Sequence, residues 1–265
     1  MFLHTPVYLI FLAIFCLLYW RLPSPKSRHW ILLAGSYGFY SLFDYRFALY
    51  LAGLTAILFW IGKAIPGNPR ARGMTVMGVA VNLGLLAFFK YSGGLVNSLS
   101  ALLVQLNLPT PPTTDGLLLP IGISFFTFQG ISYIVEIYRK KITPAALPDL
   151  ALYLAFFPKL IAGPIVSPTA FLAWLKNPSP RLEASTRNEA LLLIFSGLVK
   201  KIIIADNLAS LADVAFRAAA LPNGVSLPPM LYWQGFYLYA VEIYADFSGY
   251  TDLARGSALL LGLRM

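Results

Sequence analysis

The chain has 265 residues with a formal net charge of +9; 58% of them are hydrophobic and only 12% are charged. Soluble domains carry about 25% charged and about 45–50% apolar residues, so a soluble enzyme, a disordered chain and a nucleic-acid-binding domain are excluded as first interpretations. The apolar excess, with a mean hydropathy of +0.70, predicts an all-α polytopic membrane protein.

Apolar runs recur along the whole chain. Basic residues follow the first run, whereas in a signal peptide they precede it, so the first run is predicted to be a retained helix. The runs cover 6–20, 30–43, 46–62, 73–89, 117–137, 150–166, 188–205, 230–245 and 253–265. Several are shorter than the ~20 residues that cross the hydrocarbon core, so we expect about 8–9 transmembrane or re-entrant helices. They form one predicted integral-membrane domain, residues 1–265.

Basic residues recur in every second connection of the first half. They lie in 21–29, 63–72 and 139–149, whereas the connections between these carry few charges. Membrane proteins gather Lys and Arg in cytoplasmic loops, so these three loops are predicted to be cytoplasmic and the N-terminus periplasmic. The same rule accounts for the net charge without nucleic acid, and it indicates a multi-pass membrane protein.

Two segments depart from the simple alternation of spans. Residues 91–116 are predicted to be an external interfacial segment, because a mildly amphipathic stretch ends in a Pro/Thr-rich turn. The run 150–166 is interrupted by Pro158, Gly163 and Pro164, and its flanking charges suggest that it enters and leaves on one side. Broken helices are tolerated in membranes where protein or a water-filled cavity surrounds them, so this run is predicted to be re-entrant.

The sequence lacks the motifs of soluble enzymes. GxSxG, the P-loop, HExxH and GxGxxG are all absent, and the single cysteine, Cys16, excludes an internal disulfide. The two histidines, His4 and His29, are interpreted as interfacial residues. We therefore predict no metal site and no bound cofactor.

Polar side chains nevertheless occur within the apolar runs of the second half. They lie in 122–136, 156–165 and 244–252, and Lys200 and Lys201 stand about 12 residues, or roughly 18 Å, into a helix that starts near residue 188. Such groups are costly in a membrane unless they pair or line a path. The two lysines either snorkel from a tilted helix or face a cavity.

The segment 244–252 has a second interpretation without chemistry. Ser248, Thr251 and Asp252 are all favourable N-caps for a helix that begins near Leu253. A capped helix–turn–helix would explain them, although Asp246 lies before such a turn and is harder to explain in this way.

Taken together and in order, these stretches resemble the membrane-bound O-acyltransferase superfamily, and most of all its bacterial alginate O-acetylase-like branch. The matching stretches are LPIGISFFTFQ at 119–129, FPKLIAGPI at 157–165, GLVKK at 197–201 with ADNL at 205–208, and YADFSGYTD at 244–252. The resemblance covers essentially the whole chain. Lys159 departs from it, because relatives usually have an uncharged polar residue there.

The resemblance implies an enzyme that moves an acyl group, here acetyl, from acetyl-CoA or another cytoplasmic donor to a hydroxyl of an exported polysaccharide such as alginate. It also implies a helix bundle around a tunnel and a periplasmic acetyltransferase or export partner. The expected tunnel or donor-binding residues are Gln129, Lys159, Lys200, Lys201, Asp246, Ser248, Tyr250 and Asp252. The three lysines are the candidates for attracting donor phosphates.

The resemblance places the essential histidine, the expected general base, in a Trp-His-containing helix that follows the stretch at 244–252. No histidine follows Asp252 in this sequence, so the catalytic histidine is expected beyond Met265 and no catalytic residue is assigned within the chain. We therefore expect the 265-residue chain to be an incomplete, N-terminal part of this fold and to be inactive alone. A transporter or flippase subunit and an inert structural fragment stay open as alternatives.

Overall fold

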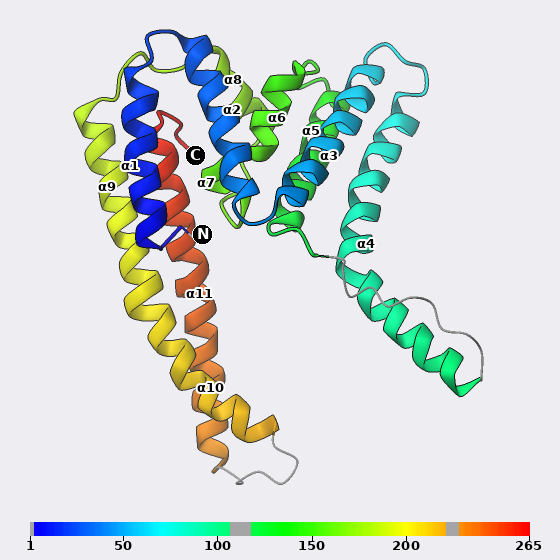
Figure 1. Ribbon diagram of the computed structural model, residues 1–265, viewed down its shortest axis with the longest axis vertical. Helices are drawn as coiled ribbons and strands as arrows, with labels where there is room; N and C mark the ends of the chain where they lie inside the picture. The colour runs from blue at the N-terminus through cyan, green and yellow to red at the C-terminus, as the bar shows by residue number, and fades with distance from the viewer. Residues whose placement is uncertain (1–2, 107–117, 221–227) are drawn as a thin grey trace. The chain divides into compact units, whose positions relative to one another are not determined.

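The computed structural model describes residues 3–106, 118–220 and 228–265, which are mostly helical and contain no strand (Figure 1). This result confirms the all-α prediction. The chain divides into two compact units, and each is described by itself. Unit 1 comprises residues 1–31, 162–164 and 178–265, and unit 2 comprises residues 32–161 and 165–177.

Unit 1 is built around one long helix, α11. The other helices of unit 1 pack along it or precede it in the chain: α1 (Pro6–Arg21), the start of α2 (Pro25–Ser41), α9 (Ala184–Leu198), the π-helix η1 (Val199–Ala205), α10 (Asp206–Ala220) and α11 (Pro229–Leu260). The helices α9, η1 and α10 follow one another without a break and run beside α11 (Figure 1). Two hydrogen bonds join α1 to α11, from the Tyr8 hydroxyl to Ser257 Oγ (2.8 Å) and from Trp20 Nε1 to the Leu260 carbonyl (2.8 Å).

The predicted break between the runs 230–245 and 253–265 is wrong, because α11 is continuous through both. The expected cap residues do not cap a helix start. Ser248 and Asp252 instead bind the ammonium group of Lys200. Their side chains therefore do not compete for backbone N–H groups, and the helix continues through them. No proline stands between Asp246 and Leu260 to end the helix.

The end of the last predicted run, 253–265, is not helical. The helix α11 ends at Leu260, and Leu261 and Gly262 form a turn in which their amides donate to the Ala258 and Leu259 carbonyls. Gly262 has a positive φ of +86°, which suits the residue that closes a helix. The residues from Leu263 to Met265 have no regular structure. The catalytic histidine expected beyond Met265 stays a prediction.

Unit 2 contains the end of α2 and six further helices, α3 (Tyr45–Ala64), α4 (Ala71–Gln105), α5 (Ile123–Tyr138), α6 (Leu147–Ala155), α7 (Phe157–Leu160) and α8 (Pro168–Lys176). The helix α5 packs against both α3 and α4, and α6 packs against α3 and α8. Asp44 caps the start of α3 by accepting a hydrogen bond from the Arg46 amide (2.8 Å). It also forms an ion pair with the Arg46 guanidinium (2.8 Å).

The two unusual segments have distinct outcomes. The fourth apolar run continues as α4 to Gln105, so the first part of the predicted interfacial segment 91–116 is helical, while its residues 107–116 lie outside the described residues. The run 150–166 is broken after Ala155 and again after Leu160, with Pro158 in the first turn of the short α7. Whether either segment is interfacial or re-entrant stays a prediction.

Many large apolar side chains on the helices are exposed. Within the part of the chain that the structure describes, two helical segments, Tyr45–Ala64 and Ala71–Val96, are long and apolar enough to cross a membrane. In α1, the buried face carries Tyr8, Leu12, Phe15 and Tyr19, yet Val7, Ile10, Ile14 and Leu17 on the other face are 54–64% exposed. A helix that is apolar on its exposed face needs a non-aqueous neighbour, which agrees with a membrane location.

Gly122 makes the turn into α5 and is expected to tolerate no side chain. Its φ is +78°, and a Cβ there would collide with the Leu160 carbonyl oxygen. Gly122→Ala should lower the melting temperature through both left-handed strain and this collision. Gly67→Ala is the matched control, because Gly67 has φ +71° and open space around it. Equal losses in the two variants would show that the close approach to Leu160 does not matter.

Candidate functional site

The eight side chains predicted to form a tunnel or donor site fall into two groups, one in each unit. Gln129 on α5 and Lys159 on α7 belong to unit 2. The other six lie on η1 and α11 in unit 1: Lys200, Lys201, Asp246, Ser248, Tyr250 and Asp252. Partners in these groups are 30, 48 and 52 residues apart in sequence, so tertiary packing and not local spacing brings them together.

In unit 2, the side chain of Lys159 is fully buried, and its amino group contacts an amide and two aromatic rings. Its Nζ donates a hydrogen bond to Gln129 Oε1 (2.7 Å) and lies 4.2 Å from the ring centre of Tyr153 and 5.1 Å from that of Phe171. A buried charge is costly without partners, and ring faces and a carbonyl oxygen are the partners a cation prefers here. This pairing explains how Lys159 can stand in an apolar helix.

Unsatisfied polar atoms lie in the same part of unit 2. Within the described residues, Gln129 Nε2 and Thr127 Oγ1 are buried and lack a hydrogen-bond partner. Buried polar groups without partners are uncommon in folded proteins and often mark a place for water or a ligand. The Gln129–Lys159 pair therefore retains hydrogen-bonding capacity.

In unit 1, Lys200 links η1 to α11. Its Nζ contacts Asp252 Oδ2 at 2.6 Å and Ser248 Oγ at 3.0 Å, and Ser196 on α9 donates a further hydrogen bond to Asp252 (3.2 Å). The side chain of Asp252 is only 12% exposed. A carboxylate this buried needs a cation, and Lys200 supplies it.

Lys201 makes a second ion-paired cluster beside the first. Its Nζ lies 2.5 Å from Asp246 Oδ1 on α11 and 3.0 Å from Asp206 Oδ1 at the start of α10. The two consecutive lysines thus hold carboxylates on two helices. Because each ammonium group is already matched by a carboxylate, its attraction for a donor phosphate is weaker than the sequence alone predicts.

Both lysines stand in the π-helix η1, where the backbone makes a wider turn than in an α-helix. Such segments are rare, occur mostly inside α-helices and are frequent at functional sites. The sequence analysis did not predict this feature. Tyr250, the remaining candidate, is half-buried on α11, with its hydroxyl against the backbone of Ala162.

A residue interpreted from the sequence as interfacial lies within electrostatic range of this cluster. His4, just before α1, is half-buried and interacts with Lys201, Asp206 and Asp246. Burial, followed by the Lys201 ammonium group, lowers the pKa of His4, although the two carboxylates oppose this shift.

We expect His4 to make the stability of the protein depend on pH. Because its pKa is lowered in the folded state, the unfolded chain takes up a proton first as the pH falls below about 6.5. Stability should therefore be full above that pH and decrease toward the lowered folded pKa. Melting temperatures at pH 7.5 and pH 5.5 measure this loss. His4→Gln should reduce the difference, and an undiminished difference in this variant would contradict the prediction.

Residues 134–265, which include Lys159 and both lysine–carboxylate clusters, match the model of MBOAT, the membrane-bound O-acyltransferase family. Over 261 residues the chain is also 37% identical to "Probable alginate O-acetylase AlgI" of Pseudomonas aeruginosa, covering 96% of the chain and 48% of that relative. The chain belongs to the membrane-bound O-acyltransferase family. The resemblance predicted from the polar stretches is thereby confirmed.

Other MBOAT relatives have different named acceptors. The chain is 30% identical over 298 residues to the peptidoglycan O-acetyltransferase of Helicobacter pylori, covering 99% of the chain and 54% of that protein. It is 27% identical over 159 residues to the teichoic acid D-alanyltransferase of Streptococcus thermophilus, covering 59% of the chain and 38% of that protein. The chain spans about half the length of the alginate and peptidoglycan relatives.

Proposed function

We propose that this protein acts as a membrane O-acetyltransferase that transfers acetyl toward a hydroxyl of an exported polysaccharide. The observation that carries the proposal is the 37% identity to a probable alginate O-acetylase across 96% of the chain. The named peptidoglycan O-acetyltransferase supports the same chemistry on a different glycan. Acetyl is thus the group favoured by both relatives, and a glycan hydroxyl is the acceptor.

The polar clusters support a path for the donor through the protein. A charged thioester such as acetyl-CoA does not cross lipid, so an enzyme with its donor and acceptor on opposite faces has to provide a polar route. In this proposal about 8–9 transmembrane or re-entrant helices surround a tunnel, and the paired lysines and carboxylates belong to its walls. A wall role suits Lys200 and Lys201 better than phosphate capture, because aspartates already match their charge.

The proposal places the protein in the bacterial inner membrane with a periplasmic N-terminus, and a periplasmic partner would complete transfer to the polymer. In a Cys16→Ser background, Arg70→Cys and Lys141→Cys should react with a membrane-impermeant maleimide only after the cells are permeabilised. Leu42→Cys, in the turn before α3 and 68% exposed, should react in intact cells. This pattern follows from basic loops facing the cytoplasm, and the reverse pattern would contradict the proposed orientation.

Deletion of the gene in its own host tests the activity. We expect ester-linked acetate on exported polysaccharide to fall to the background level and to return when the full gene is restored. Measuring acetate on peptidoglycan in the same cells separates the two acceptors named by the relatives. Unchanged acetate on both polymers would refute the proposal.

A further inference from the structure

A cavity in unit 2 lies where the two candidate membrane spans meet. It has a volume of about 580 Å³ and is bounded by the end of α3, the start of α4 and the loop after α5. Ligand pockets typically have volumes of about 300–1,000 Å³, so this one is large enough for a small molecule or a lipid headgroup. Because α3 ends at Ala64 and α4 begins at Ala71, the cavity lies at the level where the chain leaves the hydrocarbon.

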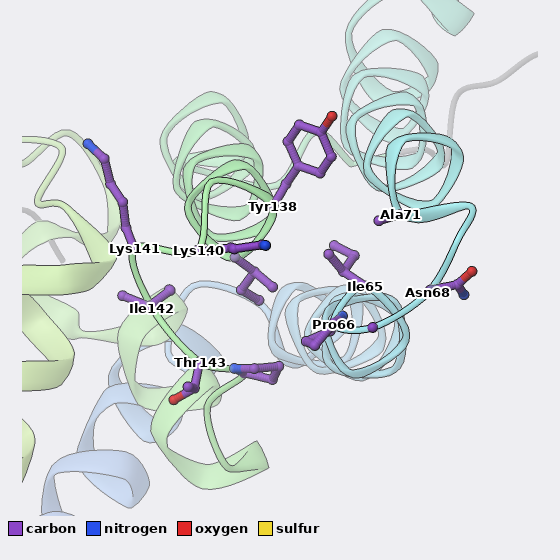
Figure 2. A pocket seen from close by; sticks show the side chains of 12 residues that line it. Ile65, Pro66, Asn68, Ala71, Tyr138, Lys140, Lys141, Ile142 and Thr143 are labelled. Carbon is purple, nitrogen blue, oxygen red and sulfur yellow. The ribbon is translucent and has the colours of Figure 1, made fainter.

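The lining of the cavity combines apolar side chains with positive charge. Ile65, Ile137 and Ile142 provide apolar surface, whereas Lys140 and Lys141 are cationic and none of the lining residues is acidic. Figure 2 shows Lys140 extending from the end of α5 toward Ile65, while Lys141 points away. The cavity therefore suits an amphiphile with a negative head and an apolar body.

Lys140 occupies a backbone position that lysine rarely adopts. Its φ is +58°, and within the described residues it is the one residue other than glycine with a positive φ. This position ends α5, where glycine or asparagine is usual, so lysine stands there at some cost in stability. Such a cost is tolerated where the side chain has a use, and the use that fits here is binding an anion in the cavity.

We propose that this cavity binds the phosphate headgroup of an anionic glycerophospholipid, with Lys140 contacting the phosphate and the isoleucines contacting the glycerol and the upper acyl chains. Basic pockets between membrane helices recognise lipid headgroups in this way. The position at the end of the spans favours a lipid over a soluble phosphate, because a headgroup is held at this depth by its own tails. The site depends on a membrane location and not on the proposed acetyl transfer.

Native mass spectrometry of the purified chain tests the site, with dioleoyl phosphatidylglycerol and dioleoyl phosphatidylcholine as probes. We expect the protein to bind phosphatidylglycerol in preference, and Lys140→Asn to weaken that binding by about fivefold, the effect of one lysine near a lipid surface. Asparagine tolerates a positive φ, so this variant should fold; Lys140→Gly is the second variant if it does not. Lys26→Gln is the control, because it removes an exposed lysine of unit 1 that does not line the cavity.

Three results would overturn the lipid site. Equal binding of the two lipids would remove the requirement for negative charge. An equal loss in Lys26→Gln would mean that the lipid responds only to net charge. Displacement of phosphatidylglycerol by inorganic phosphate or free coenzyme A at matched concentration would identify a site for soluble phosphates instead.

Discussion

Lys200→Met is expected to lower the free energy of unfolding by about 3 kcal/mol, because it leaves a buried carboxylate without its cation. The side chain of Asp252 is 12% exposed and would keep only the Ser196 hydroxyl, 3.2 Å away, as a donor. Methionine preserves most of the side-chain volume, so the loss reports on charge and not on a cavity. Unfolding in detergent by added sodium dodecyl sulfate measures the difference from the wild-type chain.

Substitution of the other member of the ion pair should lower the free energy of unfolding by less. In Asp252→Asn the Lys200 side chain, which is 32% exposed, keeps Ser248 as a partner and gains solvation more easily. The double variant should then be more stable than the sum of the single losses predicts, since neither member is left alone. A coupling close to zero would mean that the two groups do not stabilise each other.

An exposed ion pair in the same chain provides the control. Arg217 and Asp213 lie one turn apart on α10, with side chains 81% and 59% exposed. Pairs of this kind contribute about 0.3–0.5 kcal/mol, so Arg217→Met should barely change stability. If Lys200→Met cost no more than Arg217→Met, the cluster on η1 and α11 would not hold these helices together.

The chemistry of these clusters was predictable from the sequence, but their pairing was not. Lysines and aspartates within apolar runs are costly enough to signal that they must be satisfied. Which residues pair with them depends on helix packing. Lys159 contacts Gln129 and two aromatic rings, and Lys200 contacts Asp252, which lies 52 residues later in the sequence. No periodicity in one sequence contains that information.

The capped turn considered for 244–252 is wrong for the same reason, because α11 is continuous there. Serine, threonine and aspartate favour a helix start because their side chains can bind free backbone N–H groups. That preference disappears when another helix offers a stronger partner, as Lys200 does for Ser248 and Asp252. His4 was missed for a related reason, since its neighbours Lys201, Asp206 and Asp246 lie far along the chain.

Gly249→Leu is expected to be among the most damaging single changes in unit 1. A Cβ on Gly249 would lie 2.9 Å from the Gly197 carbonyl oxygen and 3.0 Å from the Lys201 amide nitrogen, so even alanine would force the two backbones apart. Small residues let membrane helices approach closely, and the packing lost here is not recovered by lipid. We expect a loss of more than ~3 kcal/mol, above the usual range for overpacking, because backbone and not a movable side chain is in the way.

Gly53→Ala is the matched control for Gly249→Ala, because both glycines are helical but a Cβ on Gly53 would meet nothing within 4 Å. Alanine in an open helical position should stabilise by about 0.5–1 kcal/mol. The two substitutions should therefore change the melting temperature in opposite directions. Equal effects would show that the close approach of α11 to α9 does not determine the stability of unit 1.

The position of Gly249 connects this packing to the charged cluster. It stands between Ser248 and Asp252 on α11 and faces the backbone of η1, so its lack of a side chain sets the distance over which Lys200 reaches both partners. A larger residue should thus break the ion pair as well as the packing. In a Gly249→Ala background, the further change Lys200→Met should cost clearly less than ~3 kcal/mol. An undiminished cost would mean that the ion pair forms without this close contact.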